Sequence, residues 1–251
     1  MNLDLAGRSA LVVGGSDGVG RAIVHALLQQ GVVVAATYAQ EGEAALALTT
    51  ELEQERNGSF AIQMDVSDPQ VVTNVLTRIR EHFGRIAILV NNTSMVHQAL
   101  FQEMTLSAWH HVLNSNLTGV YLVTQAALPL MSEGGSIINV SACLAAVGMR
   151  GKSHYSAAKA GVIGLSRSLC KEVGTQGIRV NVVAPGVIET EEIGDLSPEQ
   201  RKRYAYLSAI GRLGRPEEVA TAVLFLASDL SSFITGTTIA IDGGVGGIGA
   251  F

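Results

Sequence analysis

The fold of this chain is decided by the stretch Val13-Gly14-Gly15-Ser16-Asp17-Gly18-Val19-Gly20. It ends an apolar run, Ser9–Val13, and leads into a helical candidate around Gly20–Gln30. Glycines at such a junction let the backbone turn sharply and let a pyrophosphate approach the N–H groups of a helix start. The literal Gly-x-Gly-x-x-Gly fingerprint is not met, because the spacing here is Gly14-xxx-Gly18-x-Gly20. A glycine-rich turn without a ligand is the alternative, but the position after the first strand favours nucleotide binding.

Short apolar, β-branched runs alternate with longer amphipathic segments along the whole chain. The expected strands are Ser9–Val13, Val32–Thr37, Phe60–Met64, Ile86–Val90, Ser136–Val140, Arg179–Val183 and Thr237–Ile241. The expected helices are Gly20–Gln30, Glu43–Arg56, Pro69–Phe83, Leu106–Met131, Tyr155–Thr175 and Pro216–Leu226. Strands that are apolar throughout suit a sheet covered on both faces, and repeated strand–helix order indicates parallel pairing. We therefore predict an α/β fold, a single Rossmann domain over residues 1–251 with a doubly wound, seven-stranded parallel sheet.

Composition excludes several classes of function. Hydrophobic residues make up 47% of the chain and charged residues 16%, and the net charge is −5, with no basic run to suit nucleic acid or an anionic membrane. No apolar stretch is long enough to span a bilayer, and the N-terminus lacks a signal-peptide pattern, so we expect a cytoplasmic protein. The two cysteines form no CxxC motif, and the six histidines form no HxxxH or HExxH motif, so no metal site is expected.

A second pattern is the pair Tyr155 and Lys159, four residues apart on an expected helix. At this spacing the two side chains lie on one helix face, about one turn from each other. A phenol, whose pKa is about 10, is a poor acid–base catalyst at neutral pH, but a neighbouring ammonium favours the phenolate. The pair therefore suits proton transfer, although a Tyr and a Lys at this spacing also occur by chance on many helices.

Together, the glycine spacing and Tyr155-xxx-Lys159 resemble the short-chain dehydrogenase/reductase family, in particular its 3-oxoacyl-[acyl-carrier-protein] reductase and polyketide ketoreductase type. Further motifs match in order over nearly the whole chain. They are Asp65-Val66, Asn91-Asn92, Asn114-Ser115-Asn116-Leu117-Thr118-Gly119, Asn181-Val182-Val183-Ala184-Pro185-Gly186, Arg212-Leu213-Gly214-Arg215-Pro216 and Asp242-Gly243-Gly244. So many motifs in order make chance agreement negligible.

The resemblance implies an oxidoreductase that passes a hydride between a nicotinamide cofactor and a 3-oxoacyl or polyketide-like carbonyl substrate. In such enzymes the counterpart of Tyr155 donates or accepts the proton, that of Lys159 lowers the pKa of the tyrosine, and that of Asn116 anchors a water. The resemblance also implies cofactor contacts at Gly14, Ser16, Asp17, Gly18, Val19, Gly20, Tyr38, Asp65, Val66, Asn92, Tyr155, Lys159, Pro185, Gly186, Ile188 and Thr190.

One catalytic position departs from the family pattern. The family's serine lies thirteen residues before the tyrosine, and that position here is Ala142. Ser141 stands one place early, and neighbouring side chains of an extended strand point to opposite faces, so we expect Ser141 not to reach the substrate unless a bulge re-aims it. Ser94, and after it Thr93, is the candidate replacement donor; the alternative is that both are solvated loop residues. Ser94, Ala142 and Met149 are expected to border the substrate, under a lid at about residues 187–212.

The cofactor preference depends on the end of the second strand. Relatives that prefer NAD carry an acidic residue where this chain has Tyr38, and relatives that prefer NADP place an arginine at Ala39 or at Asp17. Neither signature is complete in this chain. The missing acidic residue at position 38 favours NADP(H) over NAD(H).

Two expectations concern the protein as a whole. The family packs its long fourth and fifth helices, here about Leu106–Met131 and Tyr155–Thr175, into tetramers, so we expect a homotetramer. The competing function is a regulatory or non-redox nucleotide-binding protein in which turnover is weakened or lost. The intact set of Tyr155, Lys159 and Asn116 argues against that function, because a purely structural role does not require all three.

Overall fold

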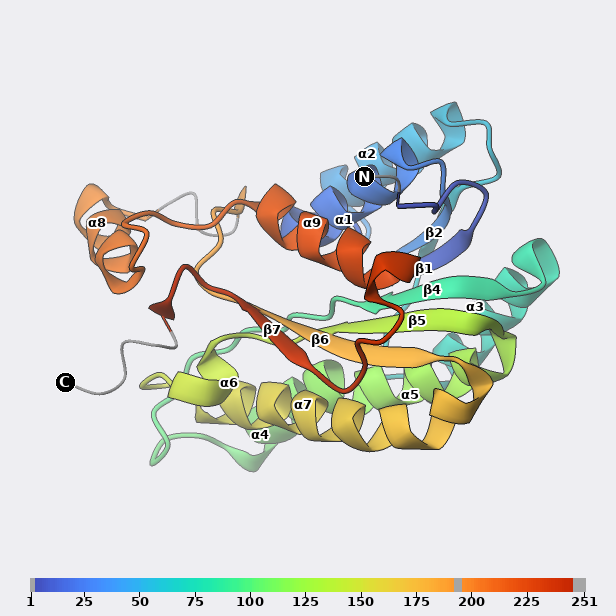
Figure 1. The fold of residues 1–251 in the computed structure, drawn as a ribbon. Helices are drawn as coiled ribbons and strands as arrows, with labels where there is room; N and C mark the ends of the chain where they lie inside the picture. Colours follow the sequence, from blue (N-terminus) through green and yellow to red (C-terminus); the bar gives the residue numbers. More distant parts are fainter. Residues whose placement is uncertain (1–2, 192–195, 246–251) are drawn as a thin grey trace.

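Seven strands lie side by side in one parallel sheet at the centre of the computed structural model, which describes residues 3–191 and 196–245 (Figure 1). The strands are β1 (Ser9–Val13), β2 (Val33–Tyr38), β3 (Phe60–Gln63), β4 (Ile86–Asn91), β5 (Met131–Val140), β6 (Arg179–Pro185) and β7 (Thr238–Ile241). Their order in the sheet is β3-β2-β1-β4-β5-β6-β7. The chain therefore winds outward from β1 to one edge, returns to β4, and winds outward to the other edge. The predicted fold class is confirmed.

Helices cover both faces of the sheet. On one face pack α1 (Gly18–Gln29), α2 (Glu43–Gln54) and α9 (Pro216–Ala227), and on the other α3 (Pro69–Phe83), α5 (Gly119–Ala127) and α7 (Ser153–Val173). Neighbouring strand residues point to opposite faces of the sheet. Val12 packs in the core beneath α1, α2 and α9, Leu11 packs in the core beneath α3, α5 and α7, and both are fully buried. This two-sided burial explains why the strands are apolar at consecutive positions.

The segment Leu106–Met131 is not the single helix that the sequence predicts. It consists of α4 (Leu106–Leu113), a π-helical turn (Asn114–Thr118), α5 and a 3-10 turn (Leu128–Leu130), and β5 begins at Met131. Pro129 explains the end of α5, because proline has no N–H to continue the helical hydrogen bonds. Tight packing accompanies the π-helical turn, since a Cβ on Gly119 would lie 2.6 Å from a methyl group of Val66. No sequence pattern identifies that turn in advance.

Two further helices, α6 (Leu144–Val147) and α8 (Pro198–Leu207), were not among the expected elements. The start of α8 does carry a sequence signal, because Ser197 and Gln200 form a capping box and Pro198 stands at the first helical position. Within the expected lid, residues 192–195 lie outside the described residues. Ile188, at the start of the lid, forms a β-bridge with Gly214, just after its end. Helix α8 stands apart from the sheet (Figure 1).

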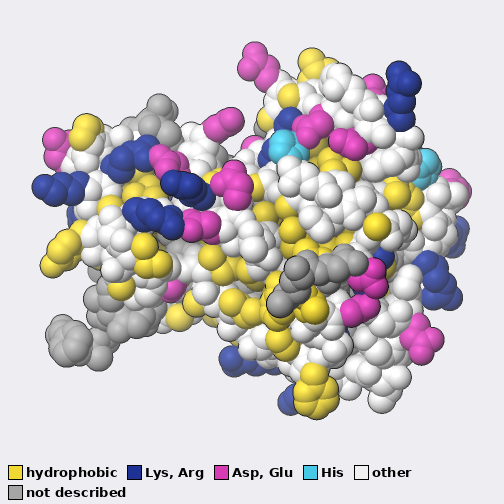
Figure 2. Space-filling view, turned by 45° about the horizontal axis from the view of Figure 1, so that its top comes forward, with side chains coloured by type: hydrophobic (Ala, Val, Ile, Leu, Met, Phe, Trp, Pro, Cys, Tyr) yellow, Lys and Arg dark blue, Asp and Glu magenta, His cyan; other side chains and the backbone are white. Residues whose placement is uncertain are grey.

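The surface of this lid segment carries charges of both signs. Figure 2 shows Lys and Arg side chains gathered over the lobe that α8 forms, where Arg201, Lys202 and Arg203 follow one another. Arg201 forms an ion pair with Glu189, which precedes the helix. Among the described residues, no helix is both long and apolar enough to cross a membrane.

Candidate active site

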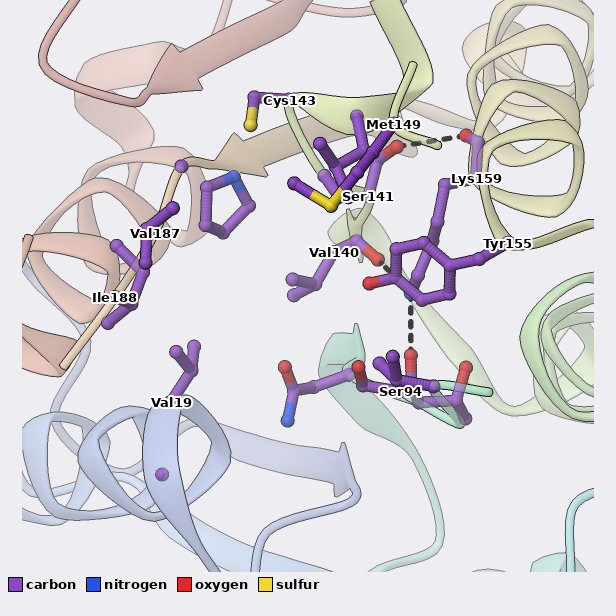
Figure 3. Close-up of a pocket in the computed structure, with 18 of the residues that line it drawn as sticks. Val19, Ser94, Val140, Ser141, Cys143, Met149, Tyr155, Lys159, Val187 and Ile188 are labelled. Carbon is purple, nitrogen blue, oxygen red and sulfur yellow. Dashed lines mark hydrogen bonds between the residues drawn. The ribbon is translucent and has the colours of Figure 1, made fainter. Parts of the chain in front are cut away.

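A cavity of about 320 Å³ opens at the carboxyl ends of the central strands (Figure 3). In a doubly wound sheet this is the edge at which loops on both sides of the switch point leave a crevice. Its walls come from the start of α1, the loop after β4, the loop after β5, α7, the turn after β6 and α8. The lining residues are Asp17, Gly18, Val19, Asn92, Thr93, Ser94, Val96, Val140, Ser141, Ala142, Cys143, Leu144, Met149, Tyr155, Lys159, Pro185, Gly186, Val187, Ile188, Leu196 and Tyr204.

The glycine-rich turn forms one end of the cavity. Gly14 (φ +73°) and Gly18 (φ +48°) adopt backbone conformations that L side chains rarely take, and the Asn92 Nδ2 donates to the Gly14 carbonyl at 2.8 Å. Asp17, at the N-cap of α1, makes no capping hydrogen bond with its side chain, so it leaves the first N–H groups of α1 uncapped. Gly18 and Val19 line the cavity at this helix start. The turn therefore fits a pyrophosphate, the group that a dinucleotide cofactor would present.

Gly20 is the most restricted residue of this turn. A Cβ at Gly20 would stand 1.8 Å from the Gly14 carbonyl oxygen and 2.7 Å from the Asn92 Nδ2. We expect Gly20→Ala to destabilise the fold by several kcal/mol, because the backbone of the turn itself must shift. Gly164→Ala, on α7 with no atom within 4 Å of the added methyl group, is the matched control and should leave stability unchanged or higher. Thermal unfolding of both variants checks this, and an equal melting temperature for Gly20→Ala would contradict it.

Tyr155 and Lys159 share the face of α7 that meets the sheet. The Tyr155 side chain projects into the cavity (Figure 3), and the Lys159 Nζ lies 5.7 Å from the centre of its ring. Lys159 is 1% exposed, and its Nζ donates to the carbonyls of Thr93 (2.6 Å) and Val140 (2.9 Å). Burial lowers the pKa of Lys159 to about 7. The ammonium is thus held at the end of β4 and β5, next to the phenol that it is expected to tune.

Ser141 is tied to the same lysine. Its hydroxyl donates to the Lys159 backbone carbonyl at 2.9 Å, while the Lys159 Nζ donates to the carbonyl of Val140, the preceding residue. Consecutive residues at the end of β5 therefore hold both the backbone and the side chain of Lys159. The Ser141 hydroxyl is directed at α7 and not at the centre of the cavity (Figure 3), as expected for a residue one place early on a strand.

The two hydroxyls after β4 have different environments. Thr93 is buried, and its Oγ1 is shielded from solvent and has no hydrogen-bond partner among the described residues. The alternative that both residues are solvated is therefore wrong for Thr93. Ser94 is exposed and borders the cavity.

Asn116 lies in the π-helical turn and is fully buried. Its Nδ2 donates to the carbonyls of Met95 (2.8 Å) and Val112 (3.0 Å), and its Oδ1 accepts from the Met95 N–H at 3.1 Å. The side chain thus holds the loop after β4 against the turn. The role of Asn116 in anchoring a water stays a prediction.

The structure brings most, but not all, of the predicted site residues to the cavity. Thr190 lies behind Gly18, 3.0 Å from the position of an added Cβ, and Tyr38 borders a different hollow between β2, β3 and α3. The Asp65 carboxylate accepts from the Ser67 N–H and hydroxyl. The other predicted residues outside the lining are Gly14, Ser16, Gly20, Val66 and Asn116.

Several lining residues were missed by sequence reasoning. They are Val96, Val140, Cys143, Leu144, Val187, Leu196 and Tyr204. Position alone gave a signal for Val187, Leu196 and Tyr204, since all three fall within the expected lid. The others are apolar side chains at or near the ends of elements, or in loops, and their spacing carries no information. Among the described residues, no three His, Cys, Asp or Glu side chains group closely enough to hold a metal ion.

Comparison with known proteins agrees with this architecture. The family described as Enoyl-(Acyl carrier protein) reductase matches residues 13–246. The chain is 39% identical to the 3-oxoacyl-[acyl-carrier-protein] reductase FabG of Vibrio harveyi and, equally, to that of Escherichia coli K12, over 97% of this chain and 99% of each relative.

Solved structures give the same result. A short-chain dehydrogenase/reductase from Serratia marcescens superposes with a TM-score of 0.91 at 33% identity, over 96% of this chain and 99% of that one. A blue fluorescent protein from a metagenomic library, solved in complex with NADPH, also superposes with a TM-score of 0.91, at 34% identity over 98% of this chain and 99% of that one. The chain therefore belongs to the short-chain dehydrogenase/reductase family and is of its FabG type.

Proposed function

We propose that this protein is an NADP(H)-dependent ketoreductase that reduces a 3-oxoacyl or polyketide-like ketone to an alcohol. The observation that carries the proposal is the Tyr155 side chain, which projects into the cavity beside the buried Lys159 ammonium. The uncapped start of α1 borders the same cavity and suits the cofactor's pyrophosphate. The 3-oxoacyl-[acyl-carrier-protein] reductases that resemble this chain support the substrate class.

In the proposed reaction, the cofactor is the source of the hydride and the protein is the source of the proton. When bound, the reduced nicotinamide supplies a hydride to the carbonyl carbon and becomes oxidised. The Tyr155 hydroxyl donates a proton to the carbonyl oxygen, so that C=O becomes CH–OH, and Tyr155 then regains a proton from water. When protonated, Lys159 places a positive charge beside the phenol, which favours the phenolate left after proton transfer. Ser94, Ala142 and Met149 line the cavity and would border the carbonyl substrate.

The test is turnover with a panel of carbonyl compounds. Purified protein is mixed with NADPH or NADH and with 3-oxoacyl thioesters, β-keto esters and aryl ketones, and oxidation of the cofactor is followed at 340 nm. We expect NADPH oxidation that depends on the ketone and yields the alcohol. Tight NADPH binding with no reduction of any ketone would favour the competing regulatory function.

The proposed preference for NADP(H) rests on the absence of an acidic side chain at position 38. The Tyr38 hydroxyl donates to Glu41 at 3.1 Å, and burial, followed by this contact, raises the pKa of Tyr38. Glu41 nevertheless places a carboxylate near the end of β2. We expect Glu41→Gln to tighten NADPH binding about 2- to 5-fold and leave NADH binding unchanged, because only the extra phosphate is repelled by the carboxylate.

Fluorescence titration with both cofactors measures this change. Glu53→Gln, which removes an exposed carboxylate from α2, the helix that follows Glu41, is the matched control and should alter neither affinity. An equal gain in affinity for NADH and NADPH in Glu41→Gln would show that the carboxylate does not repel the 2′-phosphate.

The proposed homotetramer is supported by exposed apolar side chains beside the family's interface helices. Phe101 is 75% exposed, Leu106 69% and Tyr121 45%, and such surfaces are usually covered in a stable protein. We expect light scattering during gel filtration to give a mass of about 105 kDa, four times that of the 26.3 kDa chain. A mass near 26 kDa at micromolar concentration would contradict an oligomer of any kind.

A further inference from the structure

The β5 side of the cavity offers no strong hydrogen-bond donor from a side chain to a substrate carbonyl. Ala142 occupies the position of the family's serine and lines the cavity together with Val140 and Met149, which border the space that Tyr155 enters (Figure 3). The Ser141 hydroxyl is committed to the Lys159 carbonyl at 2.9 Å. Cys143 carries only a thiol, a weak donor, and burial and the nearby Asp242 raise the pKa of that thiol.

Donors on the other walls are mostly occupied or inaccessible. The Asn92 Nδ2 donates one of its two N–H groups to the Gly14 carbonyl, and the Lys159 Nζ donates two of its three to the carbonyls of Thr93 and Val140. The Thr93 Oγ1 is shielded from solvent. Among the described lining residues other than Tyr155, the hydroxyls that remain are those of Ser94 and of Tyr204, which is on α8, while Asn92 and Lys159 each keep one N–H.

A second donor to the carbonyl oxygen has a large effect on hydride transfer. Negative charge develops on that oxygen as the hydride arrives, and one preorganised donor typically changes the rate by about 10²- to 10³-fold. A protein that lacks the donor reduces most readily a ketone that brings its own. Such a ketone holds its oxygen in an internal hydrogen bond, which stays in place while the charge develops.

We propose that the substrates of this enzyme are ketones with an internal hydrogen-bond donor to the reacting oxygen, such as ortho-hydroxyaryl ketones and enolised β-diketones. This inference rests on the function proposed above and specifies its substrate class. The side chains around the cavity suit an aromatic or conjugated ring, since Val19, Val140, Met149, Val187 and Ile188 supply apolar surface (Figure 3). The methyl group of Ala142 leaves room, at the place of the missing serine, for the hydroxyl that the substrate carries.

The experiment compares two ketones of similar size with two enzymes. 2′-Hydroxyacetophenone has the internal donor, and 2′-methoxyacetophenone lacks it. With saturating NADPH and chromatographic measurement of the alcohol, we expect wild-type kcat to be about 10²-fold higher for the hydroxy compound. Ala142→Ser should raise kcat for the methoxy compound by about 10²-fold and change that for the hydroxy compound less than 5-fold, with KM nearly constant for both.

Ala146→Ser is the matched control, because Ala146 is an exposed residue of α6 that does not line the cavity; it should change neither rate. Equal turnover of both ketones by the wild type, or equal acceleration of both by Ala142→Ser, would overturn the inference alone. So would a 10²-fold loss with the methoxy compound in Ser94→Ala or Tyr204→Phe, which would identify a protein donor. No turnover of any ketone, in the wild type or in Ala142→Ser, would overturn the proposed function together with the inference.

Discussion

Tyr155→Phe is expected to lower kcat for ketone reduction by about 10³-fold or more while the protein stays folded and binds cofactor. The substitution removes one hydroxyl from a side chain that is 7% exposed and keeps the ring that packs beside Lys159. General acid catalysis by a positioned side chain typically contributes about 10²- to 10⁴-fold. The loss belongs at the upper part of this range, because the cavity offers few other donors to the carbonyl oxygen.

The measurement is kcat with the best ketone of the panel, together with an NADPH titration of the same variant. Tyr206→Phe is the matched control: Tyr206 is 86% exposed on α8, so loss of its hydroxyl should leave kcat unchanged. If Tyr155→Phe retains more than a tenth of the wild-type kcat, Tyr155 is not the proton donor.

Lys159→Met is expected to remove activity to a similar extent and also to change how stability depends on pH. The variant keeps an unbranched side chain of similar length but loses the charge beside Tyr155, so we expect kcat to fall by about 10²- to 10⁴-fold. Burial lowers the pKa of Lys159 from 10.5 to about 7 in the folded chain, so between these values the unfolded state binds a proton that the folded state does not. The contribution of Lys159 to the free energy of unfolding therefore rises with pH between about 7 and 10.5.

The expected slope is about 1.4 kcal/mol per pH unit for one proton. Urea unfolding of the cofactor-free proteins at pH 7, 8 and 9 should show the wild type gaining free energy of unfolding relative to Lys159→Met by about this amount at each step. Lys171→Met, which removes an exposed ammonium from the same helix, should follow the wild type. If the free energy of unfolding changes with pH in the same way for the wild type and Lys159→Met, Lys159 titrates alike in the folded and unfolded chains.

Elements with strong local signals were predictable from the sequence. The bounds of β1 and α3 agree with the prediction to the residue, because β1 is an uninterrupted apolar run and α3 has a start signal at Asp68-Pro69 and a glycine at its end. The early start of β5 was not predictable. Its first residues, Met131 to Gly135, pair irregularly with β4 and include two glycines, so they carry no strand pattern.

The candidate site was predictable where chemistry depends on residue type and spacing, as for Tyr155, Lys159 and Ala142. It was not predictable where function depends on which atoms meet. Burial of the Thr93 hydroxyl depends on the folded chain around it, and the direction of the Ser141 hydroxyl is set by its bond to the Lys159 carbonyl on α7, far away in the sequence. Backbone carbonyls of Thr93 and Val140 hold Lys159, and any residue type supplies a carbonyl.

The attachment of the loop after β4 has a consequence for how the two sides of the cavity fluctuate. Thr93 is bonded to Lys159, Met95 to Asn116, and the Ala99 N–H to the Gly151 carbonyl at 3.1 Å, so this loop opens only when contacts to α7 and the π-helical turn break as well. By contrast, α8 has no buried residue. Local opening of α8 therefore costs far less free energy than opening of the loop. One side of the cavity keeps a fixed shape around the reacting carbonyl, while the other adapts to the remainder of the substrate.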